Sequence, residues 1–303
     1  MKLKIFLAAV LCVLVVGVSS VSAKQPLKTL VVTGQNNHNW QVSHQAFKLI
    51  LENSGMFTVD FAISPAKGGD MSIFKPEFAN YDLVLLDYNG DPWSDETNAK
   101  FLAYAQNGGG IIVYHAADNA FVKWDEYNKI IALGGWEGRN EQSGPYVYVK
   151  DGQIVRDTSP GGGGNHGPQH QYVLDAYDTT HPIMKGLPIH WKHAQDELYE
   201  KMRGPGNIKS LFYTAYASPS QRGSGREEPQ VFTVDYGKAR IFHIMMGHAG
   251  NSLENNPAMQ CAGFQVLLLR GAEWAATGKV KQRVPADFPT EDRISMRPDY
   301  KKP

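Results

Sequence analysis

Three short, almost wholly apolar runs constrain the fold of this chain most strongly. They occupy residues 30–34, 81–88 and 111–114, and each is followed by polar or small residues. Runs of this length bounded by turn residues are typical of strands buried on both faces of a parallel sheet. A helical stripe follows the first run (Ala46, Phe47, Ile50 and Leu51), and a helix is expected over 95–106. The alternation predicts an α/β fold with a doubly wound, mainly parallel, flavodoxin-like sheet.

The second half of the chain adds antiparallel hairpins to this pattern. Residues 146–155 alternate around Asp151-Gly152, and residues 231–245 alternate around a turn at 236–238. An Asp-Gly pair between alternating segments favours a β-hairpin. Residues 159–167 are predicted to form a flexible glycine-rich loop, and a late helix carries Phe264 and Trp274. One α/β domain is therefore expected over 24–280, followed by a polar tail over 281–303 that is packed on the surface or partly disordered.

The first 23 residues have the pattern of a secretory signal peptide. Lys2 and Lys4 precede an apolar stretch over 5–18, and Val21-Ser22-Ala23 fits a small-x-small cleavage site. The stretch is short for a membrane-spanning helix, so we expect no stable membrane insertion. A secreted or periplasmic location follows. Cleavage after Ala23 leaves Cys261 as the only cysteine, which excludes an internal disulfide in the exported chain.

Composition excludes several classes of partner. The chain of 303 residues has 30 Lys and Arg against 30 Asp and Glu, and its formal net charge is zero. A nucleic-acid-binding protein needs a basic surface to displace counterions, so no nucleic-acid partner is expected. Hydrophobic residues make up 42% of the chain, enough for an ordinary packed core.

Histidines follow two of the apolar strands. His115 comes directly after the run over 111–114, with Asp118 three residues later, and His248 follows the last strand. The loop after the first strand carries His38 and Trp40. Ligands bind beyond the carboxyl ends of parallel strands in such sheets, so these side chains are expected to share a cleft. A histidine that merely packs a loop is an equally good interpretation of any one of them alone.

Two further segments carry groups capable of chemistry. His181, Asp196, Glu197 and Tyr199 form the first, where Asp196 is expected on a solvated face and Glu197 is a candidate ligand or base. His166 and His170 lie in or next to the glycine-rich loop, which could fold over a cleft as a lid or remain exposed.

Two common chemistries are not supported by the sequence. Residues 161–164 are all glycine but lack the Lys-Ser/Thr pair of a phosphate-binding loop, so no nucleotide cofactor is expected. Cys261 lies at the start of a helical run rather than on a strand-to-helix turn. A thiol nucleophile is therefore not expected, and Cys261 is predicted to be a buried, small apolar side chain.

The ordered set of motifs resembles the trehalose-utilisation, or ThuA-like, family. The segments that carry the resemblance are 108–117, 134–135, 181–188, 196–199, 236–242, 247–248 and 274–276. The resemblance covers residues 27–280. It implies a class I glutamine-amidotransferase-like fold without the amidotransferase cysteine, and a role in the catabolism of sugars oxidised at carbon 3. His115, His181, Glu197 and His248 match recurrent polar positions of the family, whereas the region 137–170 looks longer than usual.

Two functions remain open at this point. The first is an exported enzyme that cleaves or isomerises 3-keto-glycosides, with His115, Glu197 and His248 as catalytic residues and as ligands of a divalent metal, zinc being the best match. Substrate-binding residues would then be His38, Trp40, Asp118, His166, His170, His181 and Tyr199. The second is a non-catalytic carbohydrate-binding or scaffolding protein. Either would take a small carbohydrate as partner, and homodimerisation is left open.

Overall fold

The computed structural model describes residues 25–301, and its centre is one mixed sheet of eleven strands. The main path through the sheet runs β2-β1-β3-β4-β11-β10-β9-β7-β8, and β5 pairs with β10 and β6. The strands are β1 (Leu27–Thr33), β2 (Phe57–Ile63), β3 (Leu83–Leu86), β4 (Gly110–Tyr114), β5 (Tyr146–Lys150), β6 (Gln153–Asp157), β7 (Val173–Ala176), β8 (His190–Lys192), β9 (Ile208–Tyr216), β10 (Glu227–Val234) and β11 (Arg240–Ile244).

Parallel pairing joins the first five strands of this order, from β2 to β11. The remaining pairs are antiparallel. The expected α/β fold with a parallel core and both expected hairpins is confirmed. The antiparallel part also includes β7, β8 and β9, which the sequence patterns did not predict as one layer.

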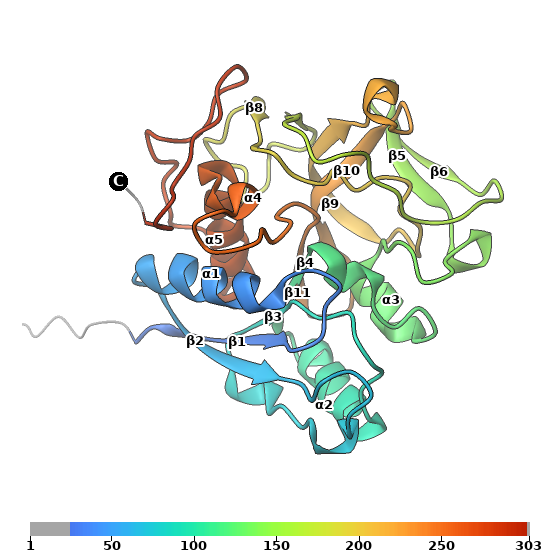
Figure 1. Cartoon of the computed structure of the whole chain (residues 1–303), viewed down its shortest axis with the longest axis vertical. Helices are drawn as coiled ribbons and strands as arrows, with labels where there is room; N and C mark the ends of the chain where they lie inside the picture. Colours follow the sequence, from blue (N-terminus) through green and yellow to red (C-terminus); the bar gives the residue numbers. More distant parts are fainter. Residues whose placement is uncertain (1–24, 302–303) are drawn as a thin grey trace, which may run out of the picture.

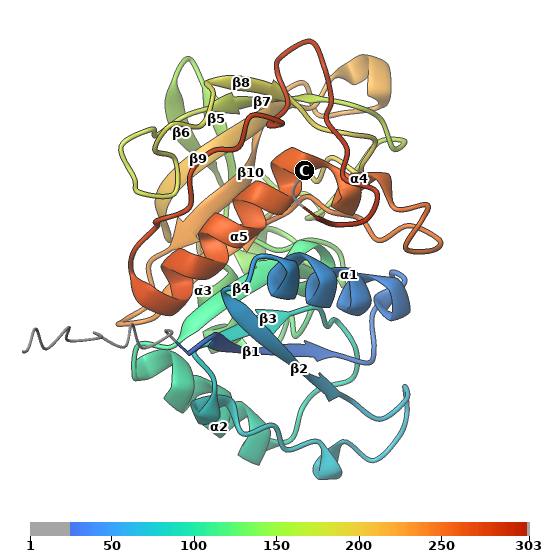
Figure 2. The same ribbon diagram turned by 90° about the vertical axis from the view of Figure 1, so that its left-hand side faces the viewer.

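Helices cover both faces of the parallel part (Figures 1 and 2). They are α1 (Trp40–Asn53), α2 (Asp95–Gln106), α3 (Asp125–Ile131), α4 (Pro257–Gln260) and α5 (Ala262–Thr277). Helices α1 and α5 share one core cluster, and α2 and α3 share the other. Neighbouring strand residues such as Ile111 and Ile112 fall into opposite clusters, because successive side chains of a strand point to opposite faces.

The segment after α5 packs against the body of the protein. It runs back alongside α5 in Figure 2, and the backbone N–H of Ala262 donates to the carbonyl of Ser295. The Arg297 guanidinium pairs with Asp287 at 2.7 Å, and its backbone N–H donates to Gln260. The sequence predicts a tail that is either packed on the surface or partly disordered, and residues 281–301 are packed on the surface. The predicted signal peptide lies outside the described residues.

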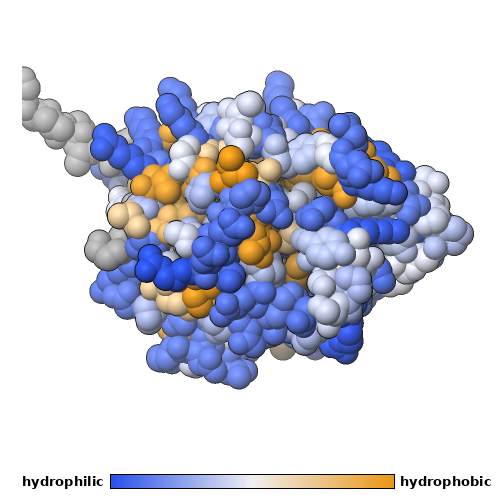
Figure 3. Space-filling view, turned by 90° about the horizontal axis from the view of Figure 1, so that it is seen from above, coloured by the Kyte–Doolittle hydropathy of each residue, from blue (hydrophilic) through white to orange (hydrophobic). Residues whose placement is uncertain are grey.

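No helix within residues 25–301 combines the length and apolar character needed to cross a bilayer. The face shown in Figure 3 is mostly hydrophilic, with apolar residues in separate patches.

Candidate functional site

Glu197 lies at the centre of a group of four histidines that come from four different loops. Its Oε2 lies 3.4 Å from Nε2 of His38 and 3.6 Å from Nε2 of His115. Its Oε1 lies 3.3 Å from Nε2 of His248 and 3.9 Å from Nε2 of His166. These five residues are called the Glu197 cluster below. The cluster sits beyond the carboxyl ends of β1, β4 and β11, where a parallel sheet binds its ligands.

His115 occupies the sharp turn that follows β4. Its φ of 43° lies in the left-handed region, which is strained for a residue other than glycine. Such strain is typical of functional sites. The Nδ1 atom lies 2.6 Å from the carbonyl oxygen of Met245, which can only accept, so Nδ1–H donates and the Nε2 lone pair faces Glu197. Tyr199 stacks on the imidazole at 4.2 Å and fixes its plane.

A chain of buried and partly buried hydrogen bonds orients His38. Asp87, directly after β3, accepts from Nδ2 of Asn36 at 2.9 Å and from the Ser43 hydroxyl at 2.6 Å. The amide oxygen of Asn36 therefore faces His38, and it accepts from the backbone N–H at 2.9 Å and from Nδ1 at 3.3 Å. This arrangement directs the Nε2 lone pair of His38 to Glu197. Burial raises the pKa of Asp87 to about 7.

His166 reaches the cluster from the glycine-rich loop between β6 and β7. Its Nδ1 lies 2.8 Å from the carbonyl oxygen of Gly167, which can only accept, so Nδ1–H donates. The Nε2 atom of His166 therefore faces Glu197, as it does in His38 and His115. Backbone hydrogen bonds join Asn165 to Glu200 and Gly163 to Arg139. The loop expected to be flexible is thus tied to its neighbours along its length.

Asp196 holds two members of the cluster in place. Its Oδ1 accepts from the backbone N–H groups of Glu197 at 2.8 Å and His248 at 2.9 Å. Its Oδ2 accepts from Gly247 N at 2.6 Å and from Nε2 of His193 at 2.8 Å. The expectation that Asp196 lies on a solvated face is wrong, because its side chain is fully buried. The buried carboxylate is stable there because four donors replace its water shell.

The charges in the cluster favour a cation at its centre. Burial alone would raise the pKa of Glu197, but the imidazoles of His115 and His38 beside the carboxylate outweigh it and hold that pKa well below its usual range. Burial lowers the pKa of His38 to about 4, and burial together with His115 lowers the pKa of His248. Burial opposes a charge on His115, yet Glu197 and Asp196 raise its pKa. An ionised carboxylate therefore faces imidazoles of which His38 and His248 favour the neutral form.

The donor atoms of His38, His115 and Glu197 lie within 4.8 Å of one another, which is close enough for one metal ion. His115 Nε2 and Glu197 Oε2 are buried, and neither has a hydrogen-bond partner among residues 25–301. Two ligands of tetrahedral zinc, each at ~2.0–2.1 Å, are about 3.4 Å apart. The Glu197 oxygens lie 3.3–3.6 Å from the Nε2 atoms of His38, His115 and His248. The donors therefore fit a zinc-like ion. The ligand set inferred from the sequence lacked His38, whose ring lies 4.7 Å from that of His115, compared with 5.8 Å for the ring of His248.

Not every residue selected from the sequence joins the cluster. His181 packs on Phe212 and Trp274 at 4.8 and 5.0 Å, so its expected place near the cluster is wrong. Asp118 is fully buried beside His243, with 3.4 Å between Oδ2 and Nε2.

Of three other candidates, His170, Trp40 and Tyr199, only Tyr199 stacks on a histidine of the cluster. His170 is paired through its backbone with Asp196, but its ring contacts Tyr172 rather than Glu197. Trp40 begins α1 two residues after His38 and contacts His44 at 5.5 Å. Tyr199 stacks on His115 and lies parallel to His166 at 6.1 Å, so it does line the cluster.

Sequence reasoning missed the residues that support the cluster. Asp87 could have been found, because it directly follows a buried strand as His115 does. His193 gives no local signal, since its role depends on contact with Asp196 and on its interaction with the buried thiol of Cys261. Cys261 itself is fully buried, as predicted.

Comparisons with known proteins agree with this architecture. Residues 28–275 match the ThuA family, described as trehalose utilisation. A ThuA-like protein from Parabacteroides merdae has 67% sequence identity and a TM-score of 0.91, covering 92% of this chain and 100% of its own. A ThuA-like protein from Bacteroides uniformis has 21% identity and a TM-score of 0.55, covering 88% of this chain and 97% of its own. The comparison with curated proteins gives no match. The chain therefore belongs to the ThuA family and has its class I glutamine-amidotransferase-like fold.

Proposed function

We propose that this protein is an exported, metal-assisted enzyme that cleaves the glycosidic bond of 3-keto-glycosides. The observation that carries the proposal is the Glu197 cluster, in which one ionised carboxylate faces the Nε2 atoms of four imidazoles. In His38, His115 and His166 the opposite ring nitrogen is occupied by a carbonyl-type oxygen. Histidines that bind metals are oriented by such contacts to the second ring nitrogen.

His38, His115, His248 and Glu197 would hold the ion. A divalent ion there would act as a Lewis acid toward the carbon 3 carbonyl oxygen of the substrate. A ketone at carbon 3 makes the proton on carbon 2 acidic, so a positioned base suffices to remove it.

His166 is the residue best placed for proton transfer. Its side chain is 37% exposed, whereas those of His38 and Glu197 are each 10% exposed. The partly exposed imidazole of His166 can accept the carbon 2 proton and return it to the departing oxygen at carbon 1. The carbon 2 electron pair then forms the carbon 1–carbon 2 double bond as the carbon 1–oxygen bond breaks, so atoms and charge balance.

The decisive experiment combines metal analysis with turnover. Purified full-length protein should contain about one divalent ion per chain and should release glucose from trehalose oxidised at carbon 3, but not from trehalose itself. His248→Ala should lower turnover by roughly 10²-fold or more. The control is His190→Ala, because His190 also pairs with a carboxylate, Asp175, but at an exposed position.

Two results would count against the enzyme. Bound sugar without turnover of the oxidised disaccharide would favour the non-catalytic carbohydrate-binding function. Unchanged turnover by folded His248→Ala would remove this histidine from the site. The export part has its own measurement: mass spectrometry of natively expressed protein should find the first residue at or near Lys24.

A further inference from the structure

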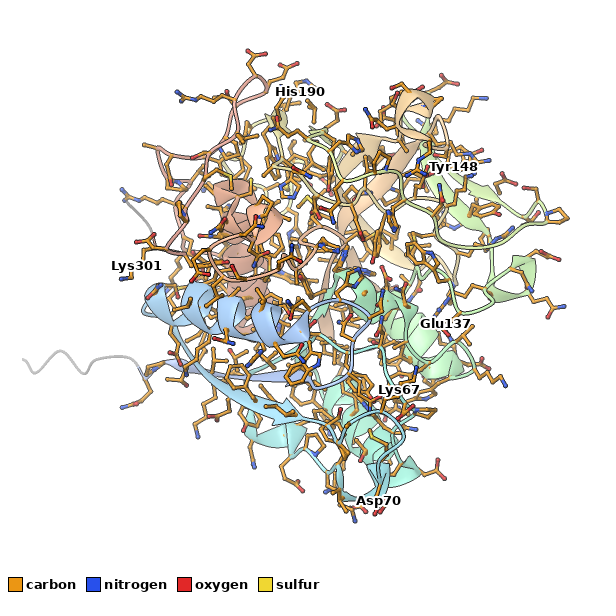
Figure 4. All side chains as sticks on the ribbon, in the orientation of Figure 1. Lys67, Asp70, Glu137, Tyr148, His190 and Lys301 are labelled. Carbon is orange, nitrogen blue, oxygen red and sulfur yellow. The ribbon has the colours of Figure 1, made fainter. Side chains whose placement is uncertain are left out.

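A hollow of about 430 Å³ lies beside the Glu197 cluster and has no role in the function proposed so far. Its lining includes Asn37, Trp40, Gln41, Lys67, Asn89 and Glu137. In Figure 4, Lys67 and Glu137 lie on the same side of the molecule, beyond the N-terminal end of α1. The volume is within the ~300–1,000 Å³ range of small-molecule sites.

The topology of the sheet marks this hollow as a binding position. The loops that line it follow β1 and β3, which are neighbours in the order β2-β1-β3-β4. The helix after β1 covers one face of the sheet, and the helix after β3 covers the other. The two connections therefore diverge between β1 and β3, and this topological switch point is where doubly wound sheets bind ligands.

The hollow and the Glu197 cluster are lined by residues that are neighbours in the sequence. His38 belongs to the cluster, and its close neighbours Asn37 and Trp40 line the hollow. On the other side Glu137 lines the hollow, and the preceding Trp136 contacts Tyr199 at 4.7 Å. A ligand longer than one sugar ring can therefore extend from the cluster into the hollow.

The lining favours a neutral ligand over an anion. Three N–H groups at the start of α1 are already bonded within the chain: Trp40 N to His38 O at 2.9 Å, and Val42 N and Ser43 N to Asn39 O at 3.0 and 3.1 Å. The helix terminus is thus not free to hold a phosphate. Lys67 and Glu137 carry opposite charges, so the lining adds no net charge.

The remaining groups suit a polyhydroxylated ring. Asn37 and Asn89 hydrogen-bond each other through their side chains, and Gln41 is an exposed amide. Amides both donate and accept hydrogen bonds, as sugar hydroxyls require. The half-exposed indole of Trp40 adds a flat apolar surface for the carbon–hydrogen face of a ring.

We infer that the switch-point hollow binds the second ring of a disaccharide whose first ring occupies the Glu197 cluster. This inference rests on the proposed function for the placement of the first ring. It assigns the preference for a two-ring substrate to Trp40 and Gln41, which lie outside the group of metal-binding side chains.

The test uses unreactive sugars, so that it remains independent of turnover. Titrations of the full-length protein, followed by ligand-observed NMR, would compare trehalose, glucose and adenosine monophosphate. Wild type should bind trehalose about tenfold more tightly than glucose, and should not bind the nucleotide in the hollow. Trp40→Ala and Gln41→Ala should lower the affinity for trehalose about tenfold and about threefold, and change the affinity for glucose by less than twofold.

Further variants control for non-specific effects and for misfolding. Gln45→Ala, one turn along α1 and outside the hollow, should bind both sugars as wild type does. If Trp40→Ala does not fold, as judged by circular dichroism, Gln41→Ala and Trp40→Phe carry the test. Equal affinity of wild type for the two sugars, or wild-type binding of trehalose by folded Trp40→Ala and Gln41→Ala, would overturn the inference. A lack of turnover with oxidised trehalose would instead contradict the proposed function.

Discussion

Asp196 and Glu197 are neighbours in the sequence with different roles in the structure. The Asp196 carboxylate is satisfied by four donors and holds the backbone, whereas Oε2 of Glu197 has no hydrogen-bond partner among the described residues. A carboxylate with satisfied oxygens positions its neighbours, and one with an unsatisfied buried oxygen is available to a ligand. Asp196 therefore supports the site, and Glu197 is the residue available to a ligand.

The Asp196→Asn substitution tests this support. Asparagine replaces one carboxylate oxygen with an N–H₂ group, which cannot accept. Two of the four hydrogen bonds that Asp196 accepts are therefore lost. We expect a loss of ~2–3 kcal/mol in the free energy of unfolding and a roughly 10–100-fold loss of metal affinity. Urea unfolding and zinc titration measure the two effects. Asp175→Asn is the control, since Asp175 also pairs with a histidine but is exposed. Unchanged zinc affinity in Asp196→Asn would mean that the backbone holds Glu197 unaided.

Glu228 gives a pH-dependent prediction away from the cluster. Burial raises its pKa from 4.5 to about 7, and Glu200 adds to the increase. Between these values the folded state binds more protons than the unfolded state, so this group increases stability as the pH falls from 7 to 4.5. Glu228→Gln should therefore have a higher free energy of unfolding than wild type at pH 8. The difference between variant and wild type should be ~1–3 kcal/mol larger at pH 8 than at pH 5.

Urea unfolding at the two pH values checks this expectation. Glu77→Gln is the control, because the side chain of Glu77 is 62% exposed. A pH-independent difference between wild type and Glu228→Gln would show that Glu228 has the same pKa in both states.

At the level of elements, the site depends on the turns that end strands. The turn after β11 places Gly247 at a φ of 110°, and a Cβ atom there would lie 2.5 Å from Phe264 and 2.8 Å from Tyr114. This close approach turns the chain after β11 so that the backbone N–H of His248 donates to Asp196. Only glycine satisfies both the backbone angle and the space.

Gly247→Ala should therefore displace the turn. We expect a loss of ~2–4 kcal/mol in the free energy of unfolding, from backbone strain and steric overlap, together with weaker zinc binding. Gly237→Ala is the matched control, because Gly237 also has a positive φ of 55° but no atom within 4 Å of the added Cβ. Equal losses in the two variants would mean that backbone strain alone decides the effect.

Local patterns predicted most elements well. The helix over 95–106 has the expected bounds, because Ser94 caps it and its apolar residues recur at helical spacing. The hairpin of β5 and β6 turns at Asp151-Gly152 as expected. The pairing of β9 with β7 was not predicted, because it joins segments distant in the sequence whose short patterns do not specify a partner.

At the level of the whole molecule, the Glu197 cluster joins five loops, so a bound ion should stabilise the entire fold. Zinc at 100 times its dissociation constant adds about 2.7 kcal/mol to the free energy of unfolding, or roughly 5 °C in Tm for a domain of this size. Differential scanning calorimetry with zinc and with a chelator measures the shift. His115→Ala should lose most of the shift, and His190→Ala should retain it. A Tm independent of zinc and chelator in wild type would argue against a metal in the cluster.

The sequence by itself determined the parallel core, the two hairpins, and the positions of His115 and His248 after strands, since these depend on periodicity and turns within a few residues. Only the tertiary structure decided which side chains meet. It moved His38 from the expected substrate-binding residues to the candidate metal ligands, excluded His181, and buried Asp196, because these outcomes depend on distances between loops far apart in the chain. Asp87, which orients His38, bonds to Ser43 and Asn36, which lie 44 and 51 residues away, and a hydrogen bond over that separation leaves no periodic pattern in the sequence.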